Sequence, residues 1–192
     1  MRILDIFFSL LSLFLLSPIL ICCSIILKFT GEKKVFYYQK RIGKNGKNFR
    51  IIKFATMLER SPFTADKTLT ITDDPRVLPF GKFLRLSKLN ELPQLMNVLR
   101  GEMSLVGPRP LVRRDLAAVE EKLKFELLSV PPGITSIGSI FFRNEEKYLQ
   151  PDIDVRKFYD TVISPYKVKL DLYYIRNKNV KLYFILILIT IW

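Results

Sequence analysis

The first apolar stretch of the chain is long enough for a membrane helix. No charged residue occurs between Ile6 and Leu27, and a helix of that length reaches across a hydrocarbon core of about 30 Å. A cleaved signal peptide is a poor alternative, because the run is too long, no small-residue cleavage site follows it, and Arg2 with Asp5 makes a weak positive start. We therefore expect a membrane helix over residues 1–28.

A Ser17-Pro18 pair interrupts this run near its middle. Pro18 lacks a backbone N–H and clashes with the preceding turn, so a kink is expected, and the Ser17 hydroxyl can bond to a carbonyl that the proline frees. Two arrangements fit: a kinked helix that spans the membrane, or one that enters and returns. If the helix turned back, the flanking charged residues would share the cytoplasmic side. These residues are Arg2, Asp5, Lys28, Lys33 and Lys34.

A β-hairpin is predicted after this helix. Val35–Tyr38 and Phe49–Phe54 are rich in β-branched and aromatic residues, and the Asn45-Gly46 pair between them favours a tight turn. The turn segment 39–47 is crowded with Lys and Arg. It is either a solvated basic loop or a surface that grips anionic lipid headgroups, at about 1 kcal/mol per basic residue near the membrane.

The central stretch, residues 87–110, predicts a helix. Asn90 is a suitable N-cap and Pro93 is tolerated only in a first turn, so the helix is expected to begin at Glu91. An apolar face follows at helical spacing, and Gly101 stands where a left-handed residue ends a helix. The residues of that face are Leu92, Leu95, Met96 and Leu99.

Both ends of this helix carry candidate chemistry. Glu91 lies at the electropositive helix start, which suits phosphate groups or a metal–phosphate complex. An Asn-Glu pair at a helix start is also typical of plain capping. After the helix, Arg109 stands between two prolines in the turn Gly107-Pro108-Arg109-Pro110. Such a stiff turn holds a guanidinium in a fixed direction.

The other segments considered next are predicted to have structural rather than catalytic roles. A surface loop or flap is expected at residues 59–72, an amphipathic helix at Leu111–Val130, and apolar and aromatic packing at Phe158–Ile175. Residues 182–192 are uncharged and mostly apolar but too short to span a bilayer reliably, so an interfacial helix is expected there.

The predicted fold class is α+β and mainly helical. It combines the membrane helix at 1–28, a compact domain with a small β-hairpin and interfacial amphipathic helices at 29–181, and an interfacial apolar segment at 182–192.

The composition indicates the kind of partner and the side chains that can serve as acid, base or metal ligand. A net charge of +13 over 192 residues suits a partner that carries phosphates, and the absence of His leaves carboxylates as the acid, base or metal-binding groups. Cys22 and Cys23 are adjacent within the apolar run, which predicts neither a disulfide framework nor a zinc site. No nucleic-acid-binding module is recognisable, so nucleic-acid binding is not expected despite the charge.

Several blocks, in the right order, resemble the bacterial sugar transferases, the monotopic phosphoglycosyl transferases. The blocks are Gln39-x-Arg41-x-Gly43, Lys53–Met57, Asp74–Val77, Ser87–Pro110, Gly133-Ile134-Thr135, Arg143-Asn144 and Lys169–Asn177. Outside the central stretch three positions depart from the usual pattern: Ala55 and Pro131, where basic residues are usual, and Ser136, where glycine is usual. The resemblance covers nearly the whole chain and implies a re-entrant membrane helix broken at Ser17 and Pro18.

The resemblance also implies a reaction at the cytoplasmic face of the bacterial inner membrane. Members of this family move a sugar 1-phosphate from a UDP-sugar to undecaprenyl phosphate, which gives undecaprenyl-diphosphate-sugar and UMP and initiates a surface glycan. The resemblance implies Mg²⁺ held by Glu91 and contact with anionic membrane lipid, and it leaves a homodimer open. The phosphate- or nucleotide-sugar-binding residues that it implies are Arg41, Lys53, Arg76, Arg109 and Arg143.

The candidate catalytic positions are Asn90 and Glu91, and the first departs from the family pattern. Family members carry an Asp-Glu pair there, in which the Asp is understood as the nucleophile and the Glu binds magnesium. A carboxamide is a very poor nucleophile towards phosphorus, so no covalent intermediate is expected at Asn90. Three interpretations remain. Glu91 is the nucleophile, or Glu91 holds magnesium for direct attack by the lipid phosphate, or the chain is a catalytically impaired membrane-bound scaffold that binds polyprenyl phosphate or a glycan-assembly partner.

Overall fold

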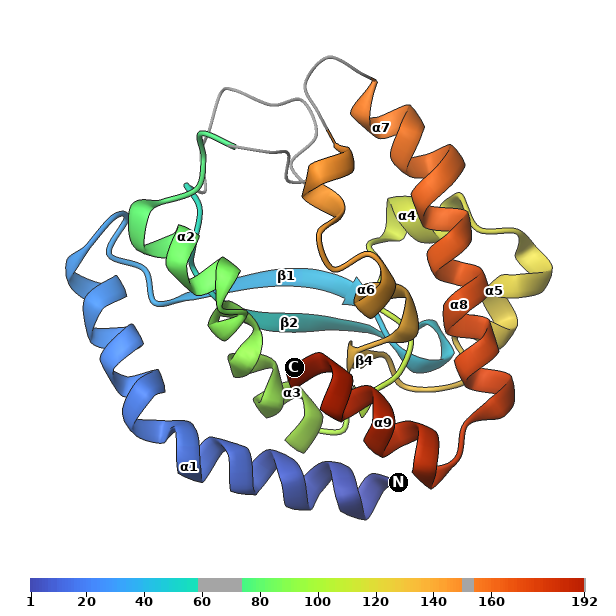
Figure 1. Ribbon diagram of the computed structural model, residues 1–192, viewed down its shortest axis with the longest axis horizontal. Helices are drawn as coiled ribbons and strands as arrows, with labels where there is room; N and C mark the ends of the chain where they lie inside the picture. Colours follow the sequence, from blue (N-terminus) through green and yellow to red (C-terminus); the bar gives the residue numbers. More distant parts are fainter. Residues whose placement is uncertain (59–73, 150–153, 192) are drawn as a thin grey trace.

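The computed structural model describes residues 1–58, 74–149 and 154–191, and in it helices surround a small central β-hairpin (Figure 1). The strands are β1 (Phe36–Ile42), β2 (Asn48–Phe54), β3 (Ser104–Val106) and β4 (Gly133–Thr135). The α-helices are α1 (Arg2–Phe29), α2 (Pro79–Leu86), α3 (Leu95–Leu99), α4 (Arg113–Ala117), α5 (Glu121–Leu127), α6 (Ile137–Phe141), α7 (Val155–Phe158), α8 (Ser164–Asn177) and α9 (Val180–Ile191). Short 3₁₀ turns form η1 (Lys44–Gly46), η2 (Leu89–Gln94) and η3 (Glu145–Tyr148), and η4 (Tyr159–Ile163) is a π-helix. The mainly helical α+β fold class is confirmed.

The predicted β-hairpin is confirmed, with a first strand longer than the sequence indicated. β1 pairs antiparallel with β2 from Phe36 opposite Phe54 to Ile42 opposite Asn48. The turn uses the left-handed backbone region at Asn45 (φ 56°) and Gly46 (φ 73°), a conformation that Asn and Gly adopt at low cost. A second, parallel pair of very short strands, β3 and β4, was not predicted.

The helix α1 is long and apolar enough to cross a membrane, and it curves along one side of the domain (Figure 1). Pro18 lies inside it and leaves the Phe14 carbonyl without its usual backbone donor. The Ser17 hydroxyl donates to that same carbonyl oxygen at 2.7 Å. The predicted bond from Ser17 to a freed carbonyl is therefore confirmed, and it lowers the cost of the proline within an apolar helix.

Both ends of α1 contact the same globular domain. At the first end, Arg2 donates to the carbonyls of Val98 and Leu99, in the last turn of α3, at 2.6 and 3.0 Å. Beyond Pro18, the buried side chains of α1 pack in one apolar cluster with β2 and α2. That cluster contains Cys23, Leu27, Phe54 and Leu84.

Asp5 anchors the start of α1 to two further elements. Its carboxylate is only 3% exposed, and it accepts hydrogen bonds from the Ser104 hydroxyl, the Leu105 N–H and the Tyr183 hydroxyl, the last at 2.7 Å. Tyr183 belongs to α9, so the predicted apolar segment is helical over its described residues, 182–191, and packs one face against the domain. Its other face stays exposed, as Leu188 shows at 66%.

The predicted helix from Glu91 is partly wrong. The chain first forms the 3₁₀ turn η2, preceded by Lys88 in the left-handed region at φ 59°, and only then the short helix α3. Pro93 explains the difference, because it has no N–H for an α-helical bond and disfavours the α conformation of the residue before it. Asn90 is consequently not an N-cap but lies inside η2, at 8% exposure. The left-handed Gly101 is confirmed at φ 82°.

The expected apolar face of this helix is also only partly realised. Leu95 is buried, but Met96 is 39% exposed, and Val98, which lay outside the predicted face, is fully buried. Switching from 3₁₀ to α geometry at residue 95 rotates the following side chains away from the positions that a continuous α-helix would give them.

A single helix at Leu111–Val130 is also wrong. Two short helices, α4 and α5, occupy this segment, and Glu120 between them has an extended ψ of 137°. The break lets Val119 and Leu127 both pack against Val168 and Leu172 of α8. The predicted loop or flap at residues 59–72 lies outside the described residues.

Candidate functional site

The site begins with an ion pair between a strand and the central 3₁₀ turn. Lys53 Nζ, near the end of β2, donates to Glu91 Oε1 of η2 at 2.6 Å. Their side chains are 19% and 24% exposed, so the pair is partly buried but still reachable from solvent. β2 packs closely against η2, and this packing brings together two residues that the sequence placed in separate blocks.

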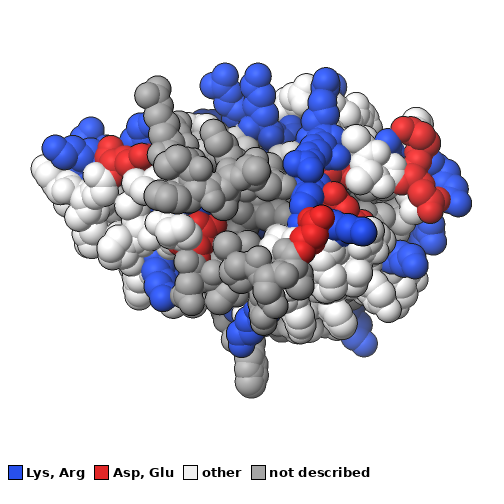
Figure 2. Space-filling model, turned by 90° about the horizontal axis from the view of Figure 1, so that it is seen from above, with Lys and Arg blue, Asp and Glu red and all other residues white. Residues whose placement is uncertain are grey.

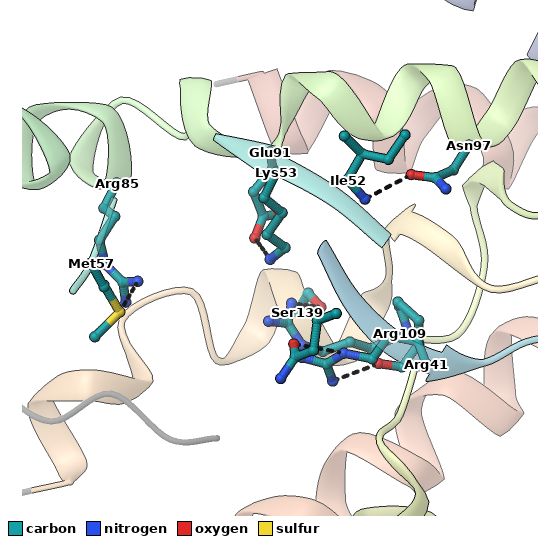
Figure 3. Close-up of polar contacts among 11 residues, drawn as sticks. Arg41, Ile52, Lys53, Met57, Arg85, Glu91, Asn97, Arg109 and Ser139 are labelled. Atoms are coloured by element: carbon teal, nitrogen blue, oxygen red, sulfur yellow. Dashed lines mark hydrogen bonds and ion pairs between the residues drawn. The ribbon is translucent and has the colours of Figure 1, made fainter. Parts of the chain in front are cut away.

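Arg109 faces this pair from the proline-flanked turn (Figure 3). The backbone at Gly107 packs closely against the Pro131 carbonyl. A Cβ added to Gly107 would lie only 2.6 Å from that carbonyl oxygen, so this end of the turn has little room to move. Arg109 donates its backbone N–H to Asp171 Oδ2 at 3.0 Å, and its Nη1 lies 3.4 Å from Ser139 Oγ. The predicted fixed direction of the Arg109 guanidinium therefore has a structural basis in the backbone as well as in the prolines.

Arg41 joins the same group from β1. Its Nη1 donates to the Pro110 carbonyl at 3.0 Å, and its Nη2 donates to Gln39 Oε1 at 2.6 Å. Burial and the neighbouring Arg109 lower the pKa of Arg41 to about 10. Arg109 thus lies close enough to disfavour the charge of Arg41, an arrangement that favours an anionic ligand between or beside the two arginines.

The electrostatics of Glu91 depend on these cations. Burial by itself would raise its pKa, but Lys53 and Arg109 outweigh that effect and hold the pKa at about 2, against an ordinary value of 4.5. Burial lowers the pKa of Lys53, and Glu91 counteracts this only in part. Glu91 is therefore ionised at neutral pH.

The group carries more positive than negative charge. Lys53 is paired with Glu91, and Arg41 and Arg109 lie together near that pair (Figure 3). Lys and Arg also predominate over Asp and Glu on the outer face that Figure 2 shows. Partly buried guanidinium and ammonium groups in excess of carboxylates are suited to the oxygens of a phosphate or diphosphate. We call Arg41, Lys53, Glu91 and Arg109 the phosphate cluster.

Arg76 and Arg143, also predicted to bind phosphates, show no contact with this cluster among the described residues. Arg76 is 5% exposed and forms a bidentate ion pair with Asp74 in the turn before α2. Arg143 is exposed, and its Nη2 lies 3.4 Å from the Thr190 carbonyl oxygen of α9. Their predicted roles stay predictions.

Sequence reasoning missed a buried polar group beside Arg109. Asp171 and Lys167 lie on α8 at 4% and 6% exposure, and Lys167 forms an ion pair with Glu145. The Glu91 and Glu145 carboxylates raise the pKa of Arg109, although burial opposes them. The signal in the sequence was a few acids and lysines among the apolar and aromatic residues of Phe158–Ile175, where a buried charge needs a partner.

Few side chains near the phosphate cluster are available as ligands for a metal ion. Within residues 1–58, 74–149 and 154–191, no group of three or more acidic or cysteine side chains is placed to hold an ion. Glu91 offers one carboxylate, of which Oε1 already accepts from Lys53. Because Mg²⁺ is often held by one or two carboxylates together with substrate phosphates, these residues fit the ion only when a phosphorylated substrate completes its ligands.

Comparisons with known proteins identify close relatives. The family model "Bacterial sugar transferase" matches residues 1–192. The exopolysaccharide production protein ExoY of Sinorhizobium fredii is 38% identical over 161 residues, which cover 77% of this chain and 71% of ExoY. The UDP-glucose:undecaprenyl-phosphate glucose-1-phosphate transferase of Escherichia coli is 38% identical over 140 residues, 71% of this chain and 30% of that protein. The undecaprenyl-phosphate galactose phosphotransferase of Salmonella typhimurium is 33% identical over 174 residues, 83% of this chain and 35% of that protein.

Proposed function

The chain belongs to the bacterial sugar transferase family, and on that premise we propose that it transfers a sugar 1-phosphate from a UDP-sugar to undecaprenyl phosphate. The products are undecaprenyl-diphosphate-sugar and UMP, and the reaction initiates a surface glycan. The printed names of the Escherichia and Salmonella relatives describe transfers of this kind. The observation that carries the proposal is the phosphate cluster, in which the Lys53–Glu91 ion pair lies near two further cations, Arg109 and Arg41.

The phosphate cluster suits the charge changes of this reaction. An oxygen of the lipid phosphate forms a bond to the phosphorus that carries the sugar, and the bond from that phosphorus to the oxygen bridging it to UMP breaks, so that UMP leaves with the bonding electrons. Negative charge is then spread over several phosphate oxygens. Arg41, Lys53 and Arg109 stabilise that charge, and phosphoryl transfer depends mainly on such positioning and neutralisation.

Glu91 carries the central chemical role in this proposal. Asn90 has no anionic oxygen with which to attack phosphorus, whereas Glu91 is ionised and lies within the cluster. Glu91 acts either as the nucleophile that takes the phospho-sugar or as a Mg²⁺ ligand during direct attack by the lipid phosphate. When bound, Mg²⁺ supplies further neutralisation of phosphate charge and is held by Glu91 with phosphate oxygens of the substrate.

The deciding experiment compares wild type, Asn90→Asp and Glu91→Gln. We expect UMP release by the wild type at saturating magnesium, loss of at least about a hundredfold in Glu91→Gln, and little change or a decrease in Asn90→Asp, which places a second anion beside the first. Intact-mass analysis after incubation with UDP-sugar alone separates the two roles of Glu91. A phospho-sugar adduct on Glu91 identifies a nucleophile, and an active enzyme without an adduct favours direct transfer.

The alternative is a membrane-bound scaffold that binds polyprenyl phosphate or a glycan-assembly partner without turnover. Asn90 is the observation that favours it, because the family's nucleophile is missing at that position. The same experiment distinguishes the two functions. An inactive wild type that Asn90→Asp rescues would show that our reading of Glu91 is wrong and that the natural chain is impaired.

We also propose that α1 is re-entrant, with both ends at the cytoplasmic face of the bacterial inner membrane and in contact with anionic lipid. Arg2 and Asp5 at one end and Leu27 at the other contact the same domain, which a helix that crossed the membrane could not do. α1 is helical throughout Arg2–Phe29, and the Ser17–Phe14 bond lowers the cost of Pro18 within it. A reporter placed ahead of Arg2 that proved accessible only from the periplasm would exclude this topology.

A further inference from the structure

Asp171 occupies a position from which it can control the direction of Arg109. Its carboxylate is 4% exposed. Oδ2 accepts the Arg109 backbone N–H at 3.0 Å, and Oδ1 accepts the Gly138 backbone N–H at 3.0 Å. One side chain of α8 thus holds the proline-flanked turn and the start of α6 together.

The second of these contacts also places a side chain against the Arg109 guanidinium. Ser139 follows Gly138, and its Oγ lies 3.4 Å from Arg109 Nη1. The Ser136 hydroxyl in turn accepts the Ser139 N–H at 2.9 Å. Asp171 therefore fixes the Arg109 backbone directly and one neighbour of its guanidinium indirectly.

The space around this carboxylate allows little displacement. A Cβ added to Gly138 would lie 3.1 Å from Asp171 Oδ1 and 3.1 Å from the Lys167 backbone, so α6 approaches α8 closely only because residue 138 is glycine. A buried carboxylate is costly unless its oxygens are bonded, and here both oxygens are engaged with backbone amides. Burial still raises the pKa of Asp171, a cost that a purely apolar packing residue would not incur.

We propose that Asp171 is a positioning residue that aims the Arg109 guanidinium at the diphosphate of the nucleotide-sugar. This inference rests on the proposed function, because it assumes that the phosphate cluster binds a nucleoside diphosphate. Asp171 itself does not touch the ligand. Its effect on binding passes through Arg109, so removing Arg109 should remove most of that effect.

The test is a double-mutant cycle in equilibrium binding of UDP to the purified full chain. In Asp171→Asn the side-chain oxygen still accepts one of the two backbone N–H groups, those of Arg109 and Gly138. The new NH₂ group faces the other N–H and cannot accept from it. We expect it to raise the Kd for UDP roughly five- to tenfold in the wild-type background and less than about twofold in the Arg109→Ala background. Equal effects in both backgrounds would show that Asp171 has only a structural role and would overturn the proposal.

A matched control comes from another buried carboxylate that accepts a backbone amide, far from Arg109 in the sequence. Asp5 is 3% exposed and bonds the Leu105 N–H at 3.0 Å, on the side of the domain that faces α1. Asp5→Asn should lower the melting temperature and, combined with Arg109→Ala, should change UDP affinity additively. Should Asp171→Asn fail to fold, Ser139→Ala replaces it, with the expectation of a smaller rise in Kd that again disappears without Arg109.

Failure of this inference differs from failure of the proposed function. A chain that binds UDP with the expected coupling but releases no UMP contradicts the transferase proposal and leaves the positioning role of Asp171 supported. A wild type that releases UMP but shows no coupling between Asp171 and Arg109 supports the transferase proposal and contradicts the positioning role of Asp171. A wild type that neither binds UDP nor releases UMP overturns both.

Discussion

Two ion pairs in this molecule look alike in chemistry and differ in surroundings. Arg76 and Asp74 are two residues apart in the same turn, with side chains 6% and 0% exposed and Nη2 to Oδ2 at 2.5 Å. Lys53 and Glu91 come from separate elements, are 19% and 24% exposed, and lie 2.6 Å apart. The first pair is buried and joins two residues of one turn, whereas the second joins two elements and lies near further cations.

The difference teaches which buried charges point to a ligand. Asp74 receives the Nε, Nη2 and backbone N–H groups of Arg76, so the carboxylate is well matched by one partner. Glu91 is outnumbered, because Arg109 and Arg41 lie beside its Lys53 partner. A buried pair by itself is weak evidence of anything but local structure, and it is the surplus of positive charge that makes the second pair a candidate for phosphate binding.

The largest expected effect is on stability, at the closed pair. Asp74→Asn should lower the free energy of unfolding by about 3–5 kcal/mol, because it leaves the buried Arg76 charge without its carboxylate, while UMP release per folded molecule stays within about twofold. Chemical denaturation and initial rates measure the two quantities. Glu120→Gln, in the exposed pair with Lys122, is the matched control and should cost less than about 1 kcal/mol. A drop in rate of tenfold or more in folded Asp74→Asn would instead place Arg76 in the substrate site.

The next effect is on activity, at the open cluster. Arg109→Ala should reduce UMP release at least about tenfold, which corresponds to the roughly 1.5–3 kcal/mol of one charged hydrogen bond. Membrane extraction and the melting temperature should change little, since Asp171 accepts the backbone N–H, which alanine retains. Arg109→Lys, which keeps the charge but not the planar fork, should recover only part of the rate. A variant that misfolds would show that Arg109 is structural.

The smallest effect is the acid dependence of stability from Glu91. Its pKa is lowered to about 2 in the folded chain from an ordinary value of 4.5. Its contribution is therefore fully present above pH 4.5 and is lost as the pH falls towards 2. Between these values wild type should lose about 1–2 kcal/mol more than Glu91→Gln in urea unfolding at each pH. Parallel curves for the two proteins would mean that Lys53 and Arg109 do not stabilise the ionised form.

Local signals in the sequence predicted local structure well. The Asn45-Gly46 turn, the left-handed Gly101 and the Ser17 bond beside Pro18 all follow from the conformational limits of single residues. Glu91, Lys53 and Arg109 were each named as candidates, but their proximity depends on β2 packing against η2, which no pattern along the chain encodes.

The wrong helix predictions have different causes. Pro93 imposes a 3₁₀ turn around Asn90, whereas packing against α8 accompanies the break at Glu120 within Leu111–Val130. Asp171 was not named as a site residue, because it acts on backbone amides, which look the same at every position of a sequence. Side chains that act on the backbone of distant residues are therefore the hardest part of this site to predict.

The bond between Asp5 and Tyr183 sets an order of events during biosynthesis. Tyr183 follows Asp5 by 178 residues, and at about 5–20 residues per second it leaves the ribosome roughly 10 to 35 s later. Throughout that interval α1 exists without the tyrosine that later holds its first turn. The Asp5–Tyr183 bond therefore secures the first turn of α1 only after nearly the whole of the domain between them has been synthesised.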